Sequence, residues 1–164
     1  PFGTNRKLNR ISSITLDKVL APERVLILTC STKTEVLNAL IECLAQTPQV
    51  KDPQALAEGV FKREALMSTG IGLGIGIPHV RLNTVEDVVA AAALCREPII
   101  DYESLDGQPI RLVFMIAAGE GQHEQYIRLL ASLSSRLKDE TLRNALIAAP
   151  DPETFHRILI QRSQ

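Results

Sequence analysis

A glycine-rich stretch between Ser68 and Arg81 constrains this chain more than any other feature of its sequence. Every second residue from 70 to 76 is glycine, and the residues that alternate with them, Ile71, Leu73, Ile75 and Ile77, are all apolar. If the segment is extended, the period of two places these four side chains on one face and leaves the other face bare. Because glycine weakens a strand, its repetition indicates that another group approaches this backbone closely.

A proline and a histidine end the alternation at positions 78 and 79. Pro78 fixes its own φ and biases Ile77 toward extended backbone, so we expect His79 to be held rigidly at the end of the strand. The sequence leaves open what approaches the glycine face. A phosphate, the backbone of a partner and another element of this protein all fit, and the glycines can equally serve tight packing.

The rest of the chain alternates between strand and helix signals. Apolar runs predict strands at 25–28, 88–95 and 110–116, although the alanine-rich run 88–95 is also compatible with a helix. Apolar spacing and start signals (the Thr-x-x-Glu of Thr32, Asp52-Pro53 and Asp151-Pro152) predict helices at 33–46, 52–66, 122–137 and 141–148, and a last one from 151. We therefore predict an α/β fold, with a single mixed sheet of about four or five strands flanked by helices.

Length and charge restrict the class of protein. The 164 residues suit one domain, which we place at 13–164 behind a flexible N-terminal tail at 1–12. A formal net charge of −1 with scattered Lys and Arg argues against a nucleic-acid partner, and no apolar run reaches the ~18 residues needed to insert into a membrane. A start at Pro1 rather than Met is compatible with a chain trimmed from a longer protein.

Common phosphate and metal motifs do not fit the glycine stretch. A P-loop requires Gly-Lys-Ser/Thr, yet residues 68–81 contain no lysine, and the dinucleotide fingerprint requires glycine where Ile75 or Ile77 stands. The three histidines lack close-spaced ligands of the zinc kind, so neither a metal nor a cofactor is predicted. Three widely spaced cysteines indicate reduced, mostly buried thiols in a cytoplasmic protein. A cysteine nucleophile stays an alternative, although Cys95 lies in an apolar run and is expected to be inert.

The chemistry that remains is a histidine nucleophile. Neutral imidazole, with an ordinary pKa of about 6.5, offers a lone pair at cytoplasmic pH. A phosphoryl group accepted by His79 needs arginine or backbone N–H donors close to its oxygens.

Two blocks of sequence match a known family. The run Arg63-Glu64-Ala65-Leu66-Met67-Ser68-Thr69-Gly70, followed by Gly76-Ile77-Pro78-His79, resembles the fructose–mannitol–nitrogen type (type 2) of EIIA domain, part of the bacterial phosphoenolpyruvate-dependent sugar phosphotransferase system. The resemblance covers about residues 16–162 and includes a second histidine, His123, at the start of a helix. The chain departs from the family at three positions. Gly76 stands where the family often has Ala, Val80 where it commonly has Gly or Thr, and Gly119 where it often has Pro.

The resemblance implies a cytoplasmic phosphotransferase component that needs no cofactor. His79 would accept a phosphoryl group from the phosphocarrier protein HPr, or a nitrogen-type equivalent, and pass it to an EIIB domain for sugar uptake. Arg63 would neutralise the phosphoryl group, and His123 would assist without being the carrier. Alternatives are a nitrogen-type regulator, or the cytoplasmic domain of a transporter, that binds target proteins according to the phosphorylation state of His79. The sugar and the oligomeric state are not predicted.

Structural interpretations of the same residues stand beside these functional ones. His79 can cap a loop carbonyl, His123 can be an ordinary first-turn residue, and Arg63 can be solvated on a helix face. Ser68 and Thr69 are expected to be turn or cap residues. His156 is expected on the surface of the last helix. Glu64 and Arg81 either shape the site or form a surface pair that contributes little.

Overall fold

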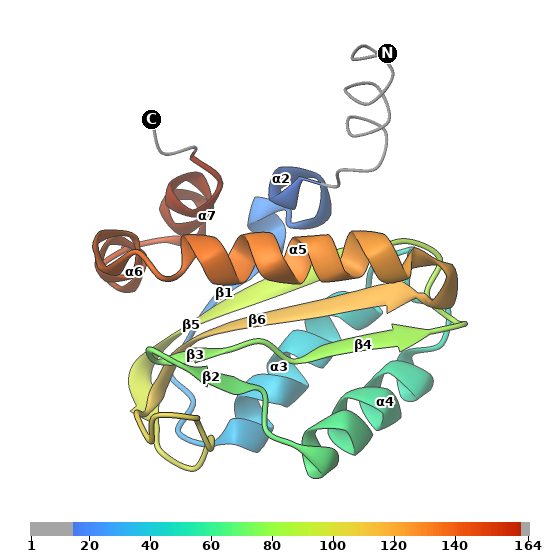
Figure 1. The fold of residues 1–164 in the computed structure, drawn as a ribbon, viewed down its shortest axis with the longest axis horizontal. Coiled ribbons are helices and arrows are strands. Elements are labelled where there is room, and N and C mark those ends of the chain that lie inside the picture. The colour runs from blue at the N-terminus through green and yellow to red at the C-terminus, as the bar shows by residue number, and fades with distance from the viewer. Residues whose placement is uncertain (1–14, 162–164) are drawn as a thin grey trace, which may run out of the picture.

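The computed structural model describes residues 15–161 and shows one open sheet with helices on both faces (Figure 1). The sheet's strands are β1 (Val25–Leu28), β2 (Gly70–Gly72), β3 (Ile75–Gly76), β4 (His79–Leu82), β5 (Val89–Ile99) and β6 (Ile110–Gly119). The helices are α2 (Leu16–Val19), α3 (Lys33–Ala45), α4 (Pro53–Leu66), α5 (His123–Arg136), α6 (Glu140–Ile147) and α7 (Pro152–Ile160), with 3-10 turns η1 (Pro22–Arg24) and η2 (Glu120–Gln122). The predicted tail at 1–12 lies outside the described residues.

The strand order β1-β5-β6-β3-β2, with β4 also beside β6, confirms the predicted mixed α/β sheet. Strands β5 and β6 are antiparallel, whereas β1 runs parallel to β5, and β3 and β4 run parallel to β6. The sheet has six strands rather than four or five because the glycine stretch supplies three of them.

The helix-start signals of the sequence act as predicted. The side chains of Thr32, Asp52 and Asp151 each accept a hydrogen bond from a backbone N–H in the first turn of the helix that follows, at 3.2, 3.1 and 2.7 Å. The alanine-rich run that was open to either interpretation forms strand β5, and its residues from 91 to 95 are fully buried.

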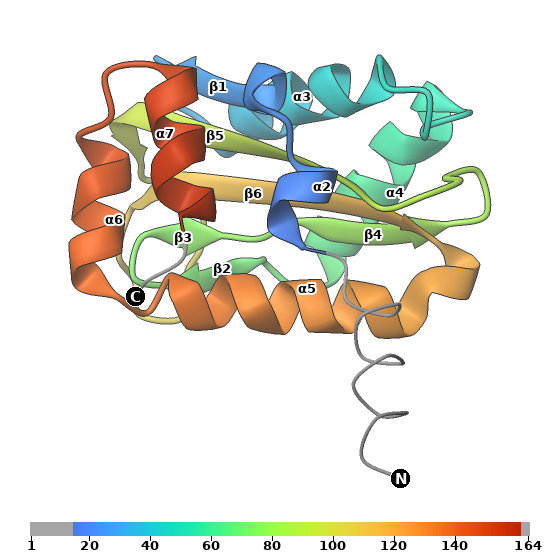
Figure 2. The same ribbon diagram turned by 90° about the horizontal axis from the view of Figure 1, so that it is seen from above.

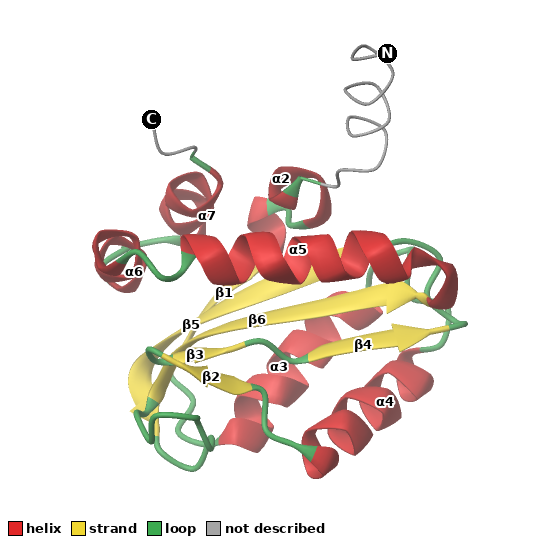
Figure 3. Ribbon diagram, in the orientation of Figure 1, coloured by secondary structure: helices red, strands yellow, loops and turns green. Residues whose placement is uncertain are grey.

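Two apolar clusters lie on opposite faces of the sheet. Figures 2 and 3 show the helices on either side of the sheet, from above and by element type. Helices α3 and α4 cover one face, and α2, α5, α6 and α7 cover the other (Figure 1). Successive residues of β5 and β6 alternate between the clusters: Ala92 and Phe114 face α5 and α7, whereas Ala93 and Met115 face α3 and α4. Because both faces are covered, these strands are apolar throughout.

The glycine stretch is a hairpin and not the single strand that its alternation predicted. Three consecutive residues have positive φ, Gly72 at 98°, Leu73 at 60° and Gly74 at 76°, and they turn β2 back onto β3. Ile71 and Leu73 are consequently 39% and 50% exposed. The expectation that four apolar side chains share one face was therefore wrong, because the reversal leaves only those at 75 and 77 in the core.

Another element of this protein approaches the glycines. A Cβ at Gly70 would lie 2.1 Å from the backbone oxygen of Glu103, and a Cβ at Gly76 would lie 2.8 Å from the ring of Tyr102. The packing interpretation of these two glycines is thus the one that the contacts support, since the 102–104 loop occupies the space that side chains would need.

Two further features complete the fold. His156, expected at the surface, is only 9% exposed, and its Nε2 lies 2.6 Å from the carbonyl oxygen of Leu20, because α7 packs its histidine face against the segment after α2. Within residues 15–161, no helix is long and apolar enough to cross a membrane.

We predict that Gly70→Ala destabilises the protein by about 2 kcal/mol and lowers Tm by about 4 to 8 °C, because backbone at Glu103 must move to admit the methyl group. Thermal unfolding followed by circular dichroism measures this. The control is Gly121→Ala, where nothing lies within 4 Å of the added Cβ and φ is not positive. Equal Tm values for both variants would contradict the packing role of Gly70.

Candidate functional site

His79 lies on an extended path formed by β3 and β4 together. Ile75 and Gly76 pair with Leu112 and Val113 of β6, and His79 then pairs with Ile116. Two residues lie between the pairs on each strand, so the register is kept. The prediction that His79 sits where the strand ends was wrong, because the chain resumes pairing as β4 directly after Pro78.

The period of two decides which face His79 occupies. Ile75 and Ile77 belong to the cluster beneath α5, whereas Val80 belongs to the cluster under α4. His79 and Arg81 therefore point to the α5 side. Among the described strands β4 pairs only with β6, so its outer edge is open, and α4 and α5 lie on either side of that edge (Figure 1). The imidazole is half-buried at this edge.

A backbone carbonyl fixes the orientation of the imidazole. His79 Nδ1 lies 2.7 Å from the carbonyl oxygen of Ile77. A carbonyl can only accept, so Nδ1 carries the proton and donates it, and the lone pair of the neutral ring resides on Nε2. The structural interpretation of His79, capping a loop carbonyl, is therefore compatible with a nucleophilic role for the other nitrogen.

The surroundings favour the neutral form of the imidazole. Burial lowers the pKa of His79 most strongly, because desolvation penalises the charged ring, and the positive charge of Arg63 lowers it further. The Ile77 carbonyl and the negative charge of Glu64 act in the opposite direction and raise that pKa. The balance lies below the ordinary value, so the lone pair is present at neutral pH.

Arg63 lies near enough to His79 for its charge to act on the imidazole. Arg63 lies in the last turn of α4, and its Nη1 donates to the carbonyl oxygen of Met67 at 2.9 Å. From there its charge acts on both His79 and Tyr126. A guanidinium tied to the end of a helix beside a neutral imidazole forms a site suited to an anion.

Sequence reasoning missed Tyr126 as a neighbour of His79. The centroid of its ring lies 5.5 Å from that of His79, with the ring planes at 59°. The guanidinium carbon of Arg81 lies 5.9 Å from the centroid of the Tyr126 ring. The signal for Arg81 was present, since the period of two places it on the face of His79, but nothing in the sequence indicated which turn of α5 would lie opposite.

His79, Arg63, Tyr126 and Arg81 together form what we call the His79 cluster. His123 is not part of it. His123 is exposed in the first turn of α5, three residues before Tyr126. No hydrogen bond or ring contact between His123 and His79 occurs in the part of the chain that the structure describes. Its assisting role stays a prediction.

A buried polar network supports the segment that leads to His79. Glu64 is 9% exposed, pairs with Lys33 Nζ at 2.9 Å, and accepts hydrogen bonds from the hydroxyl and the backbone N–H of Thr69. The Thr69 hydroxyl also lies 2.6 Å from the hydroxyl of Tyr102. Glu64 thus shapes the site and does not form a surface pair with Arg81.

The network and its neighbour Ser68 anchor the start of the hairpin. Ser68 Oγ donates to the carbonyl oxygen of Glu103 at 2.6 Å, and Ile77 N donates to the carbonyl oxygen of Thr69 at 3.0 Å. Ser68 and Thr69 are therefore structural residues, as expected. By fixing Thr69, the network also fixes Ile77, whose carbonyl orients His79.

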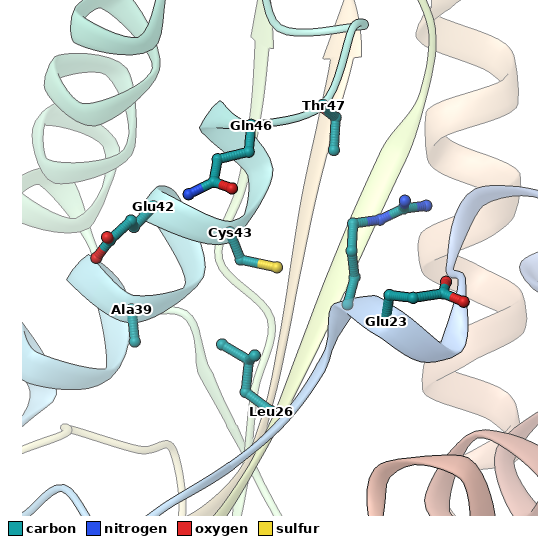
Figure 4. A pocket seen from close by; sticks show the side chains of 8 residues that line it. Glu23, Leu26, Ala39, Glu42, Cys43, Gln46 and Thr47 are labelled. Carbon is teal, nitrogen blue, oxygen red and sulfur yellow. The ribbon is translucent and has the colours of Figure 1, made fainter.

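A separate hollow lies against the other edge of the sheet, between η1, β1 and α3 (Figure 4). Its volume is about 410 Å³, and it is lined by Glu23, Arg24, Leu26, Ala39, Glu42, Cys43, Gln46 and Thr47. Burial raises the pKa of the Cys43 thiol, and Arg24 is committed to the carbonyl oxygens of Val19 and Ala90. None of these lining residues belongs to the His79 cluster.

The cysteines and acidic residues supply no alternative centre. Across residues 15–161, no group of three or more His, Cys, Asp or Glu side chains is arranged to hold a metal ion. Cys95 is fully buried, and burial raises the pKa of its thiol to about 12, which agrees with the expectation that it is inert.

Comparisons with known proteins match this fold and site to one family. The family model described as "Phosphoenolpyruvate-dependent sugar phosphotransferase system, EIIA 2" matches residues 18–162. The chain is 37% identical over 132 residues to the PTS system fructose-specific EIIABC component of Bacillus subtilis. The aligned residues make up 80% of this chain and 21% of that protein. This chain therefore spans about a fifth of that relative's length.

Relatives of similar length carry a different name. The nitrogen regulatory protein of Pseudomonas aeruginosa is 32% identical over 148 residues, which cover 90% of this chain and 96% of that protein. The crystal structure of the nitrogen regulatory protein IIA-Ntr from Neisseria meningitidis matches with a TM-score of 0.81 and 25% identity, covering 88% of this chain and 98% of that one.

We predict that Arg63→Gln raises the pKa of His79, because a positive charge that opposes its protonation is removed. A ¹H NMR titration of the His79 ring measures the pKa directly. Arg63→Lys is the matched control, since it keeps the charge and should leave the pKa close to that of the parent protein. An unchanged pKa in Arg63→Gln would show that the guanidinium does not act on His79.

Proposed function

Because this chain belongs to the EIIA type 2 family of the phosphoenolpyruvate-dependent sugar phosphotransferase system, we propose that it is a cytoplasmic phosphoryl carrier whose acceptor is His79. The observation that carries the proposal is the hydrogen bond of His79 Nδ1 to the Ile77 carbonyl, which leaves the Nε2 lone pair at the open edge of β4. A nucleophile at a sheet edge is accessible to a second protein that brings the phosphoryl group.

The transfer step is a displacement at phosphorus. Nε2 of His79 attacks the phosphorus of phospho-HPr, or of a nitrogen-type equivalent, in line with the departing nucleophile of the donor. The new N–P bond forms as the donor's bond to phosphorus breaks, and that electron pair leaves with the donor. Nδ1 keeps its proton throughout and stays bonded to Ile77, so the carbonyl steadies the positive charge that develops on the ring.

Charge stabilisation comes from side chains. In this proposal the guanidinium of Arg63 pairs with the phosphoryl oxygens, and what supports it is that Arg63 is held at the end of α4 by the Met67 carbonyl and that its charge acts on His79. The proposal rests on His79 and Arg63. The part that the family resemblance gives to His123 has no contact with His79 behind it and remains a prediction.

The destination of the phosphoryl group has two candidates. The Bacillus subtilis relative is named a fructose-specific EIIABC component, which favours onward transfer to an EIIB domain for sugar uptake. The relatives of matching length are named nitrogen regulatory proteins, which favours a regulator that binds target proteins in one phosphorylation state of His79, whether as a separate protein or as a domain of a transporter. Transfer from the phosphorylated chain to a purified EIIB domain supports the first, and capture of a target by only one phospho-state supports the second.

We predict that His79→Ala abolishes labelling by ³²P-phospho-HPr, because no other side chain of the site offers a comparable lone pair. The label should be acid-labile, as expected of a phosphoramidate, and measurable on a gel before and after acid treatment. His123→Ala is the control and should still be labelled. Strong acid-labile labelling of His79→Ala would contradict the assignment of His79 as the acceptor.

A further inference from the structure

Tyr126 is the residue of α5 that lies against the imidazole of His79. It is 6% exposed, its ring is tilted against that of His79 at 5.5 Å, and it belongs to the same apolar cluster as Ile77. Its ring thus contacts the acceptor and limits the directions in which the imidazole can turn.

The hydroxyl of Tyr126 has no hydrogen-bonding role in the fold. The chain's other tyrosine, Tyr102, shares its hydroxyl with Thr69 deep in the polar network. Within residues 15–161, no hydrogen bond involves the hydroxyl of Tyr126. The hydroxyl oxygen is not among the fully buried polar atoms of residues 15–161 that lack a partner, so it reaches solvent and is open to a ligand.

Two arginines direct this phenol toward anion chemistry. The Arg81 guanidinium lies over the Tyr126 ring at 5.9 Å, a distance at which cation–π attraction operates. The charges of Arg81 and Arg63 both act on the Tyr126 hydroxyl. The hydroxyl therefore lies in a positive field beside His79, where phosphoryl oxygens would be attracted.

Among residues 15–161, His123 makes neither the ring contact with His79 nor the contact with Arg81 that Tyr126 makes. It is exposed one turn earlier on α5, and three residues of helix displace it along the axis by about 4.5 Å from Tyr126. The residue of α5 that contacts His79 is therefore Tyr126.

We propose that Tyr126, and not His123, is the α5 partner of His79, and that its hydroxyl donates a hydrogen bond to the phosphoryl group carried on Nε2. Arg81 holds the Tyr126 ring in place, and Arg63 pairs with the remaining phosphoryl oxygens. The phenol keeps its proton during the transfer, so the balance of the displacement is unchanged. This inference rests on the proposed function, because it requires that His79 carry the group.

The protonation of the Tyr126 hydroxyl does not change near neutral pH, whereas that of a histidine in its place would. Burial raises the pKa of Tyr126 to about 12, so its hydroxyl is a donor throughout the neutral range. The titratable and charged groups that face His79 are Arg63 and Glu64 from α4 and Tyr126 from α5, with Arg81 on its own strand. Tyr126 therefore adds no ionisation of its own to the site near neutral pH.

The first test is Tyr126→Phe, which removes the hydroxyl and keeps the ring contact. The rate of His79 phosphorylation is measured by quenched-flow with phospho-HPr and, without a protein partner, with phosphoramidate. We expect the variant to be slower by about tenfold or more with both donors, as for a lost hydrogen bond to a charged group. His123→Ala should retain the parent rate with phosphoramidate. Parent-like rates in Tyr126→Phe with both donors would overturn the proposal, whatever the rate of His123→Ala.

The second test separates this role from a merely structural one. Measured with the same donor between pH 5.5 and 9, the pH profile of the rate should have the same shape in the parent protein and in Tyr126→Phe. Tyr126→His should add one ionisation near neutrality to that profile, because an imidazole then occupies the donor position. A pH profile of Tyr126→His with the same shape as that of the parent protein would contradict the proposal. If His79→Ala is still labelled, the proposed function itself fails, an outcome distinct from a parent-like Tyr126→Phe on a protein labelled at His79.

Discussion

The site depends on one hydrogen bond, from Nδ1 of His79 to the carbonyl oxygen of Ile77 two residues earlier. That bond selects the tautomer, and so it selects which nitrogen can react. It requires the Ile77 carbonyl to be fixed, and three constraints fix it. Ile77 N donates to Thr69, Pro78 restricts the backbone that follows, and the Pro78 carbonyl accepts from Ile116 N of β6. The strand that carries the proposed nucleophile is thus held before and after it.

The position of β4 makes the fixed imidazole reachable. β4 has an open outer edge, so groups from both layers of helices can meet there: Arg63 arrives from α4 and Tyr126 from α5. The polar network around Glu64 holds the hairpin behind this edge, and Glu64 also offsets part of the effect of Arg63 on the pKa of His79. The carboxylate of Glu64 therefore both supports the hairpin and affects the pKa of His79.

Local signals in the sequence predicted most of the elements, because caps and apolar spacing act over a few residues. Thr32, Asp52 and Asp151 start their helices as expected, and the Ile-Pro that precedes His79 predicted the fixed backbone at that position. The errors arose where the outcome depends on distant contacts. The hairpin within 70–76 is held by Asp106 and Ser104, whose side chains accept hydrogen bonds from Leu73 N and Gly72 N. Because these partners lie more than 30 residues away in the sequence, no local pattern predicts them. Tyr126 was missed for the same reason, since the docking of α5 decides which of its turns faces β4.

The central claim is that His79 reacts through Nε2 while the Ile77 carbonyl holds the proton on Nδ1. A long-range ¹H–¹⁵N correlation spectrum of the phosphorylated protein, recorded with ³¹P coupling, tests it directly. We predict that phosphorus is bonded to Nε2 of His79 and that Nδ1 remains protonated. Phosphorus on Nδ1, or on any residue other than His79, would contradict the account.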